Sequence, residues 1–445
     1  MNSFFSWRFV LKIIIIFSLY FWDVAMSSSV NTAPRAVLRS EQFVPVSARI
    51  TNELSDIPDF EALESSISSV LRRYDVKGAS IAVAKDGKLV FAKGMGYADA
   101  EAEEPVEPKH LFRVASISKL ITAAAIMKMQ ETGLLNLDDV VFGTEGILND
   151  SIYLDYRDPR VTRITVRNLL NHSSGWSRRF GDHMFMPHII ARELQTDLPV
   201  QATDIIRFAL NRRLHFNPGS GSSYSNLGYA ILGEIIEKIS GRSYEEFVRE
   251  TILYPLDIYE MRIGGNFEAS RFENEVRYYE QSNASEVLSF YDPLARTPLS
   301  YGGNDIETLG AAGGWIASPA EMLKLVTAID NKSDHYKILS DESIREMTTS
   351  TPGNQPIGWA GTDRFDNWWR TGTFAGTFAI VRRQNNGITW AVFFNSSTFR
   401  GTTLSSEINH HMRTALNKVE QWPDHDLFHH YETLPRLYPD LAGSK

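Results

Sequence analysis

Two side chains in the stretch RVASISKL, residues 113–120, could together support nucleophilic chemistry. Ser116 and Lys119 are three residues apart, so both would project from the same face of a helix that begins near the serine. The hydroxyl would then lie at the positive end of the helix dipole, and a lysine partly removed from water could accept its proton. A serine N-cap followed by a surface lysine has the same spacing. The pair therefore needs support from elsewhere in the chain.

A second segment supplies a candidate base. Tyr224, Ser225 and Asn226 follow the glycine- and serine-rich stretch FNPGSGSS and directly precede a helical pattern. A phenol placed between two cations has a lowered pKa, so Tyr224 is a candidate general base. Asn226 could hydrogen-bond both the lysine and a substrate carbonyl. The alternative for Tyr224 is a loop tyrosine packed in the core.

A third segment, WWRTGTFAGTFAIV at residues 368–381, combines glycines with a fixed positive charge. Gly372 and Gly376 are predicted to lie at the start of the first strand of a hairpin or just before it. Glycine there lets a ligand approach the backbone, so that exposed N–H groups can form an oxyanion hole beside Arg370. A glycine-rich turn with an exposed arginine is the alternative.

In this order, SISK, YSN and RTG resemble the S-x-x-K, Y-x-N and K-T-G motifs of the serine β-lactamase and penicillin-binding-protein superfamily. The nearest likeness is to its class C-like branch, which includes esterases and D-amino-acid peptidases. The stretches LLNHSSGW, FNPG and GAAGGWIASPAEM also agree with that branch. The resemblance covers roughly residues 60–418. Within it, His172 of the NHSSG turn is expected to be a packed, hydrogen-bonded histidine.

Carried over by position, the resemblance implies roles for the first two motifs. Ser116 is similar to the family's nucleophile, and Lys119 to its proton acceptor or electrostatic activator. Tyr224 looks like the general base and acid that moves protons between nucleophile, leaving group and water. Asn226 would orient Lys119 and the substrate. The resemblance implies no metal and no cofactor.

The third motif is expected to bind substrate along a strand. Thr371 and Gly372 would line the strand, and the backbone N–H groups of Ser116 and Thr373 would form the oxyanion hole. Arg370 departs from the family pattern, which has lysine in β-lactamases and histidine in many esterase-like relatives. Arginine keeps the charge but cannot give up a proton.

The arginine bears on both the site's chemistry and the choice of substrate. Arg370 could bind a substrate carboxylate bidentately or lower the pKa of Tyr224. Its presence makes β-lactam hydrolysis a less favoured native activity.

The sequence therefore predicts a serine hydrolase that cleaves a small-molecule or peptide ester or amide through an acyl-enzyme on Ser116. An esterase or a D-amino-acid peptidase is preferred. A penicillin-binding DD-carboxypeptidase or a β-lactamase is the alternative within the class. A catalytically silent envelope protein that binds peptidoglycan fragments or another protein is the alternative from another class.

The elements that must position these residues follow from periodicity. Apolar residues recur at helical spacing over 60–74, from Ser116 to about Gly133, over 203–213, over 228–241 and over 404–416. Two β-rich pairs turn at Asp86-Gly87 and Asn386-Gly387, which are strong hairpin signals. Strands and helices at both ends with helices between predict one sheet built from both termini. The resemblance implies an α+β fold, an antiparallel sheet flanked by helices with an inserted, mostly helical domain.

The predicted boundaries place a catalytic domain at 59–418, with its α/β part at about 59–135 and 305–418 and its helical part at about 136–304. A signal peptide is expected at 1–27, a linker at 28–58 and a C-terminal tail at 419–445. Arg8 and Lys12 precede a short apolar run, and small residues follow it, which is typical of a secretory signal. An uncleaved membrane anchor is the alternative, so the chain is expected to be exported, either periplasmic or secreted, or anchored.

Composition excludes several other classes. The chain has 445 residues, 43% of them hydrophobic, which is enough for a substantial core. Its net charge of -9 argues against a nucleic-acid partner. The absence of cysteine excludes disulfides, thiolate metal sites and cysteine nucleophiles. Nothing in the sequence indicates an oligomeric state.

Overall fold

The computed structural model describes residues 49–332, 336–350 and 355–429. The predicted signal at 1–27, most of the predicted linker and the end of the predicted tail lie outside these ranges. The described end of the linker packs onto the domain, because Ile50 is buried and the Ser55 hydroxyl exchanges two hydrogen bonds with the backbone of Ala92. Within the described ranges, no helix is long and apolar enough to cross a membrane.

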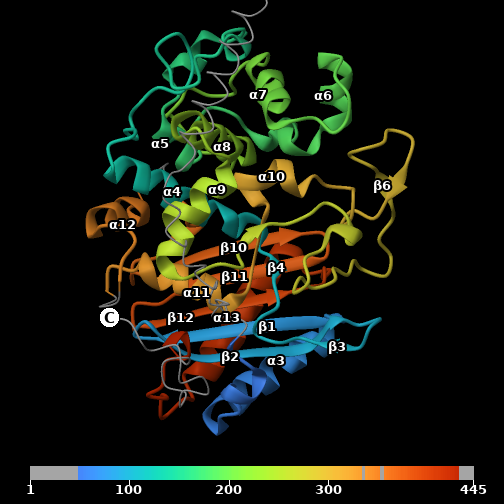
Figure 1. Ribbon diagram of the computed structural model, residues 1–445, viewed down its shortest axis with the longest axis vertical. Helices are drawn as coiled ribbons and strands as arrows, with labels where there is room; N and C mark the ends of the chain where they lie inside the picture. Colours follow the sequence, from blue (N-terminus) through green and yellow to red (C-terminus); the bar gives the residue numbers. More distant parts are fainter. Residues whose placement is uncertain (1–48, 333–335, 351–354, 430–445) are drawn as a thin grey trace, which may run out of the picture. The chain divides into compact units, whose positions relative to one another are not determined.

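The main sheet contains seven antiparallel strands drawn from both ends of the chain (Figure 1). In spatial order the strands are β3 (Glu104–Pro105), β2 (Lys88–Asp99), β1 (Gly78–Lys85), β12 (Ile388–Phe394), β11 (Thr377–Arg383), β10 (Trp368–Phe374) and β9 (Gly361–Thr362). The central pairing joins the N-terminal β1 to the C-terminal β12, with Ala79 opposite Phe394.

Smaller strands and the helices complete the fold. A three-stranded sheet has the order β4 (Phe112–Arg113), β8 (Trp315–Ala317) and β5 (Arg262–Ile263), and β6 (Val287–Leu288) pairs with β7 (Arg296–Thr297). The α-helices are α3 (Glu61–Tyr74), α4 (Ser118–Glu131), α5 (Val166–Leu170), α6 (Pro187–Leu194), α7 (Ala202–Leu210), α8 (Asn226–Ser240), α9 (Tyr244–Val248), α10 (Ile306–Gly313), α11 (Pro319–Ala328), α12 (Asp341–Thr348) and α13 (Leu404–Leu416).

Both predicted hairpins form, and their turns explain why. Asp86 and Gly87 both have positive φ, 49° and 81°, as a two-residue hairpin turn that follows the twist of its strands requires. Gly387 has φ 80° in the turn between β11 and β12. Gly376 lies just before β11, the first strand of the second hairpin, as the sequence predicted. Gly372 differs from the expectation because it lies inside a separate strand, β10, so β10, β11 and β12 form a meander.

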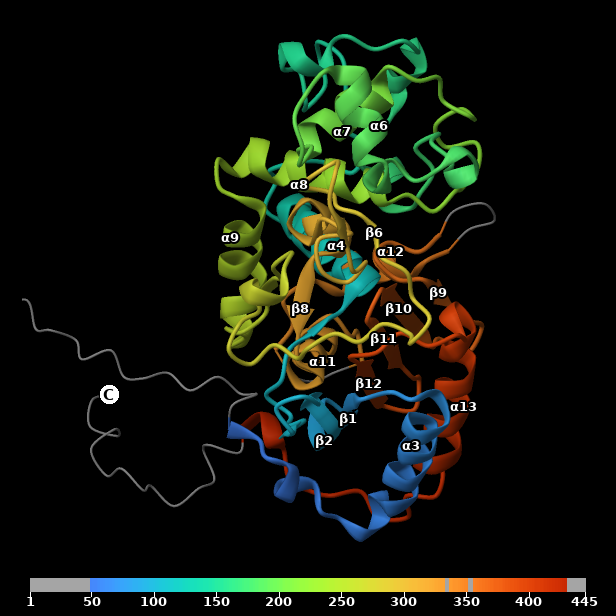
Figure 2. The same cartoon turned by 90° about the vertical axis from the view of Figure 1, so that its right-hand side faces the viewer.

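Helices cover both faces of the sheet, because side chains alternate along its strands. Ala79, Ile81 and Val83 of β1 pack with α3 and α13, whereas Ala82 and Ala84 belong to the core on the side of α11. Figure 2 shows α3 and α13 together on one side of the sheet and α11 on the other. Each fully buried aliphatic side chain in these layers contributes roughly 1.5–3 kcal/mol to the hydrophobic stabilisation.

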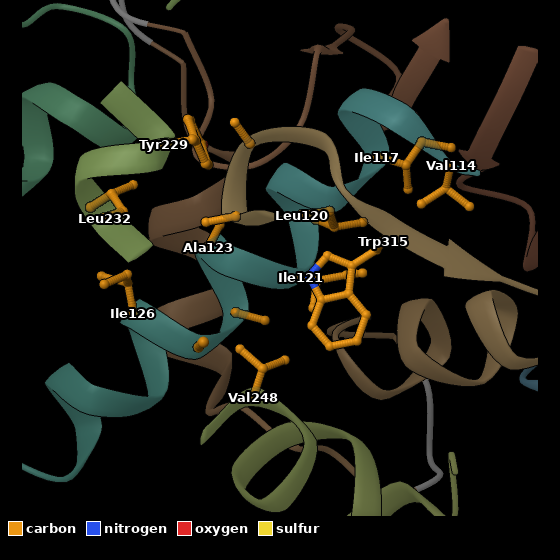
Figure 3. Close-up of a cluster of buried hydrophobic side chains, with 14 of the residues drawn as sticks. Val114, Ile117, Leu120, Ile121, Ala123, Ile126, Tyr229, Leu232, Val248 and Trp315 are labelled. Atoms are coloured by element: carbon orange, nitrogen blue, oxygen red, sulfur yellow. The ribbon is translucent and has the colours of Figure 1, made fainter. Parts of the chain in front are cut away.

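Helix α4 lies at the centre of the molecule and connects the sheet to the helical part. Its residues from Ser118 to Met127 are all buried, which is typical of a helix enclosed on every side. Figure 3 shows Leu120, Ile121 and Ile126 of α4 among side chains from α8, α9 and β8, including Leu232 and Trp315. This packing fixes α4 against α8, and the two helices carry the first and second motifs.

Helices α5 to α8 lie beyond α4 on the side away from the sheet (Figure 1). The antiparallel sheet, its flanking helices and the helical insertion confirm the predicted fold class.

Candidate active site

Ser116 lies in a strained turn just before α4. It belongs to a 3-10 turn, Ala115–Ile117, and α4 follows directly from Ser118, in agreement with the predicted helix that begins near the serine. Ala115 has φ 47°, a left-handed conformation that costs a non-glycine residue roughly 1–3 kcal/mol. The turn is held at its entry, where the backbone N–H of Val114 donates to the carbonyl of Trp315 at 3.0 Å. The half-buried serine hydroxyl is thereby presented at the end of α4.

The three motifs meet around the Ser116 hydroxyl. Its Oγ lies 2.5 Å from the phenolic oxygen of Tyr224, and either group can donate the hydrogen bond. Lys119 Nζ lies 3.5 Å from the same Oγ and 4.9 Å from the centre of the Tyr224 ring. Two candidate proton acceptors therefore contact the Ser116 hydroxyl, and the shorter contact belongs to the phenol.

Lys119 is fully enclosed, with 0% of its surface exposed. Its Nζ donates to Asn226 Oδ1 at 2.7 Å and to the carbonyl oxygen of Ala312 at the end of α10. Burial lowers the pKa of Lys119 to about 8, with Arg370 adding repulsion, although the Tyr224 phenolate opposes the shift. The lysine can therefore change its charge near neutral pH.

Tyr224 is surrounded by positive charge. Burial alone would raise its pKa, but the charges of Lys119 and Arg370, together with hydrogen bonds from Lys119 and Ser116, lower the pKa of Tyr224 to about 8. A third cation, the guanidinium of Arg178, lies 4.7 Å from the ring centre. The phenol is thus placed between cations, as the second motif predicted.

Arg370 points into this cluster rather than out of it. The side chain is 1% exposed, and its Nε donates to the backbone carbonyl of Ser116 at 2.8 Å. Its Nη2 donates to the Tyr224 oxygen at 3.3 Å. One guanidinium therefore contacts both the turn that carries Ser116 and the candidate base, Tyr224.

Asn226 begins α8, and a residue that sequence reasoning missed fixes its orientation. Asp182 Oδ2 accepts a hydrogen bond from Asn226 Nδ2 at 2.7 Å. Because a carboxylate only accepts, the amide nitrogen faces Asp182 and the amide oxygen faces Lys119. No periodicity surrounds Asp182 in the sequence, and it lies 44 residues from its partner.

His172 supports the second motif as a neutral, buried side chain. Burial, with the nearby charges of Arg370 and Lys119, holds the pKa of His172 well below its usual value. Its Nδ1 accepts a hydrogen bond from the backbone N–H of Ser225 at 3.2 Å, and its ring lies 4.7 Å from that of Tyr224. The packed, hydrogen-bonded histidine that the sequence predicted is confirmed.

Strand β10 runs directly against the turn that carries Ser116. A Cβ at Gly372 would lie 2.0 Å from the carbonyl oxygen of Val114 and 2.9 Å from the backbone nitrogen of Ser116, so only glycine fits. Thr371 is half-buried and Thr373 is exposed on either side of this contact. The structure thus brings the predicted oxyanion donors, Ser116 N–H and Thr373 N–H, onto adjacent backbone segments.

Comparison with known proteins agrees with the arrangement of this site. The beta-lactamase family model matches residues 60–408, most of the chain, which confirms the resemblance drawn from the three motifs. Protein flp of Staphylococcus aureus strain MW2 is 26% identical over 390 residues, which cover 84% of this chain and 71% of flp.

Two solved structures resemble the chain. The octameric penicillin-binding protein homologue from Pyrococcus abyssi is 28% identical, with a TM-score of 0.59 over 81% of this chain and 78% of that one. The D-amino acid amidase from Ochrobactrum anthropi SV3 is 24% identical, with a TM-score of 0.64 over 82% of this chain and 99% of the amidase. At this level of identity, the likeness to the amidase shows a shared fold alone.

Proposed function

We propose that this chain, which belongs to the beta-lactamase family of serine hydrolases, cleaves an ester or amide through an acyl-enzyme on Ser116. The contact of 2.5 Å between Ser116 Oγ and the Tyr224 oxygen carries the proposal. A phenol with a pKa of about 8 can accept a proton near neutral pH, and here it lies within hydrogen-bond reach of the nucleophile.

In the acylation step, ionised Tyr224 removes the proton from Ser116 Oγ as the oxygen attacks the substrate carbonyl carbon. The carbonyl oxygen becomes an oxyanion, which the backbone N–H groups of Ser116 and Thr373 stabilise. Collapse of this intermediate breaks the bond to the leaving group, and Tyr224 returns the proton to the departing oxygen or nitrogen. The product is an ester between the acyl group and Ser116.

In deacylation, water takes the place of Ser116 as the nucleophile, and Ser116 becomes the leaving group. Tyr224 removes a proton from water, the resulting hydroxide attacks the acyl carbon, and Ser116 leaves with the proton that Tyr224 gives back. Lys119 keeps the phenolate stable through its charge, and Asn226 holds Lys119 in place through the contact of 2.7 Å. The cycle consumes one water and restores every group.

The inward orientation of the Arg370 side chain favours an ester or amide that has no carboxylate to bind, rather than a β-lactam or a peptide with a free carboxylate. Its guanidinium is buried against Ser116 O and the Tyr224 oxygen, so it serves the base rather than reaching for a substrate carboxylate. The structural likeness to a D-amino acid amidase is consistent with amide substrates. We therefore propose an esterase or amidase activity, with D-amino-acid amides among the first substrates to assay.

An active-site phosphonate probe tests the proposal. The wild-type chain should form a covalent adduct, Ser116→Ala should abolish it, and replacing the exposed Ser282 by alanine should leave it unchanged. Equal labelling of wild type and Ser116→Ala would refute the proposal. Binding of esters or amides without any adduct would instead support a silent binding protein.

A further inference from the structure

A short turn of the helical part contacts the end of β10. The 3-10 turn His183–Phe185 is capped by Asp182, whose side chain accepts from the backbone N–H of Met184 at 3.2 Å. The same carboxylate is bound to Asn226, so the turn is tied to the second motif. Because Asn226 also binds Lys119, these hydrogen bonds fix the position of the turn relative to Ser116.

A second contact fixes the turn from behind. The ring of His183 packs edge-on against Phe208 of α7, with centroids 6.0 Å apart. Burial lowers the pKa of His183 to about 4, so the ring is neutral and packs as an apolar group at physiological pH. With Asp182 and His183 both anchored, Phe185 is presented by a fixed backbone.

Phe185 meets Phe374 of β10. Their ring centroids are 6.4 Å apart in an edge-to-face arrangement, and Phe185 remains 36% exposed while Phe374 is half-buried. The two rings leave apolar surface exposed to solvent. Contiguous exposed apolar surface often marks a ligand-binding site. The pair therefore offers an apolar surface.

Phe374 also lies beside the nucleophile turn. A Cβ added to Gly313 would lie 2.9 Å from Cζ of Phe374 and 3.9 Å from the backbone carbon of Ala115, the residue before the nucleophile. The tip of the phenyl ring therefore lies near the backbone of the turn that carries Ser116. A side chain larger than glycine at position 313 would displace it.

The strand direction indicates which part of a substrate meets this pair. Tyr224, which protonates the leaving group, is bound to Arg370 near the start of β10. Phe374 lies four residues further along the strand, about 13 Å away at roughly 3.3 Å per residue. The leaving group therefore lies toward Arg370, and the acyl group lies toward Phe374.

We propose that Phe185 and Phe374 form an acyl subsite that selects esters or amides whose acyl group is aromatic or bulky and apolar. This inference rests on the proposed function, because it assigns the acyl side of the same reaction. An aromatic acyl group would stack against one ring and meet the edge of the other, and it would cover the area that both rings expose.

A pair of substrates with one leaving group tests the subsite. Wild type should hydrolyse p-nitrophenyl phenylacetate with a higher kcat/KM than p-nitrophenyl acetate. Phe374→Ala and Phe185→Ala should each lower the phenylacetate-to-acetate ratio of kcat/KM by about tenfold, the value of one aromatic contact. Phe374→Leu keeps apolar volume if the alanine variant unfolds, and it should lower the ratio in the same direction.

Phe365→Ala is the matched control. This phenylalanine is 58% exposed and lies in the turn before β10, so the ratio should equal that of wild type. An unchanged ratio in variants of both Phe185 and Phe374 that still hydrolyse acetate would overturn the subsite alone. A wild-type chain inert to both esters and to the phosphonate probe would overturn the proposed function, and this inference with it.

Discussion

Replacing Arg370 by glutamine removes the charge that the structure places on the candidate base. The guanidinium Nη2 lies 3.3 Å from the Tyr224 oxygen, and Nε donates to the carbonyl of Ser116. Glutamine can still donate one hydrogen bond but carries no charge. The substitution therefore separates the electrostatic effect of Arg370 from its packing in the site.

The expected magnitude follows from this geometry. A pair of charges about 4 Å apart interacts by about 4 kcal/mol at an effective dielectric constant near 20, and each pKa unit corresponds to about 1.4 kcal/mol. Opposite charges at this range usually shift a pKa by about one to three units. Without the cation, the pKa of Tyr224 rises because phenolate loses its partner, and the pKa of Lys119 rises because ammonium loses a repelling neighbour. Both groups then deprotonate at higher pH.

The assay is the pH dependence of kcat/KM for a small aryl ester between about pH 6 and 10. In wild type, kcat/KM should rise with pH through an apparent pKa near 8, since the base form accumulates above it. In Arg370→Gln this limb should move up by about one to three units, so the rate at pH 7 falls by about 10- to 1000-fold and recovers at high pH. Arg370→Lys keeps the charge and should move the limb less.

Arg382→Gln is the control, because that arginine is on the neighbouring strand, beside Trp369 and Asp363. Its profile should match that of wild type. A limb that stays near pH 8 in Arg370→Gln, with only the plateau lowered, would refute the assignment of Arg370 as the charge that tunes the base.

Other substitutions test the neighbouring contacts. Asp182→Asn lets the Asn226 amide rotate, so kcat for a small ester should fall about tenfold while the thermal midpoint changes little, as steady-state kinetics and calorimetry would show; an unchanged kcat would contradict the orienting role. Gly372→Ala forces a Cβ to within 2.0 Å of the Val114 carbonyl, so phosphonate labelling should be lost, and wild-type labelling rates would contradict the close approach. Ile408→Ala leaves a cavity beneath α13, far from the site, and should lower the free energy of unfolding in urea by about 2–5 kcal/mol while the folded enzyme keeps its kcat/KM. A loss below 1 kcal/mol would contradict the tight packing of that helix.

Much of the fold could be predicted because local signals agree with the tertiary structure. The turns at Asp86-Gly87 and Asn386-Gly387 demand hairpins on either side, and α13 buries the apolar residues that its period placed on one face. The candidate site residues Ser116, Lys119 and Tyr224 meet because their motifs lie at the beginnings of α4 and α8, two helices that pack on one another.

Other features depend on contacts that spacing does not contain. Strand β10 carries a glycine and a buried arginine, so its sequence gives a weak strand signal, and pairing with β11 decides its conformation. The left-handed backbone at Ala115 is imposed by packing around α4 and β8, since alanine has no preference for it. Asp182 orients Asn226, which is 44 residues away in the sequence, and no residue next to Asp182 indicates this contact.

The inward direction of Arg370 belongs to the same group. From the sequence, a substrate carboxylate and the Tyr224 phenol were equally reasonable partners for the guanidinium. Burial against the Ser116 carbonyl and the phenol favours the second. Only the three-dimensional arrangement of β10 and the turn Ala115–Ile117 distinguishes these two partners.

The most direct test of the account is the intact mass of the protein during turnover of a slowly deacylating aryl ester. We expect a mass increase equal to the acyl group, mapped by peptide digestion to Ser116, and its absence in Ser116→Ala. Tyr224→Phe should slow its formation, because the base is lost while Lys119 remains. Turnover by Ser116→Ala at the wild-type rate, or an acyl adduct mapped to a different residue, would contradict the assignment of Ser116 as the nucleophile.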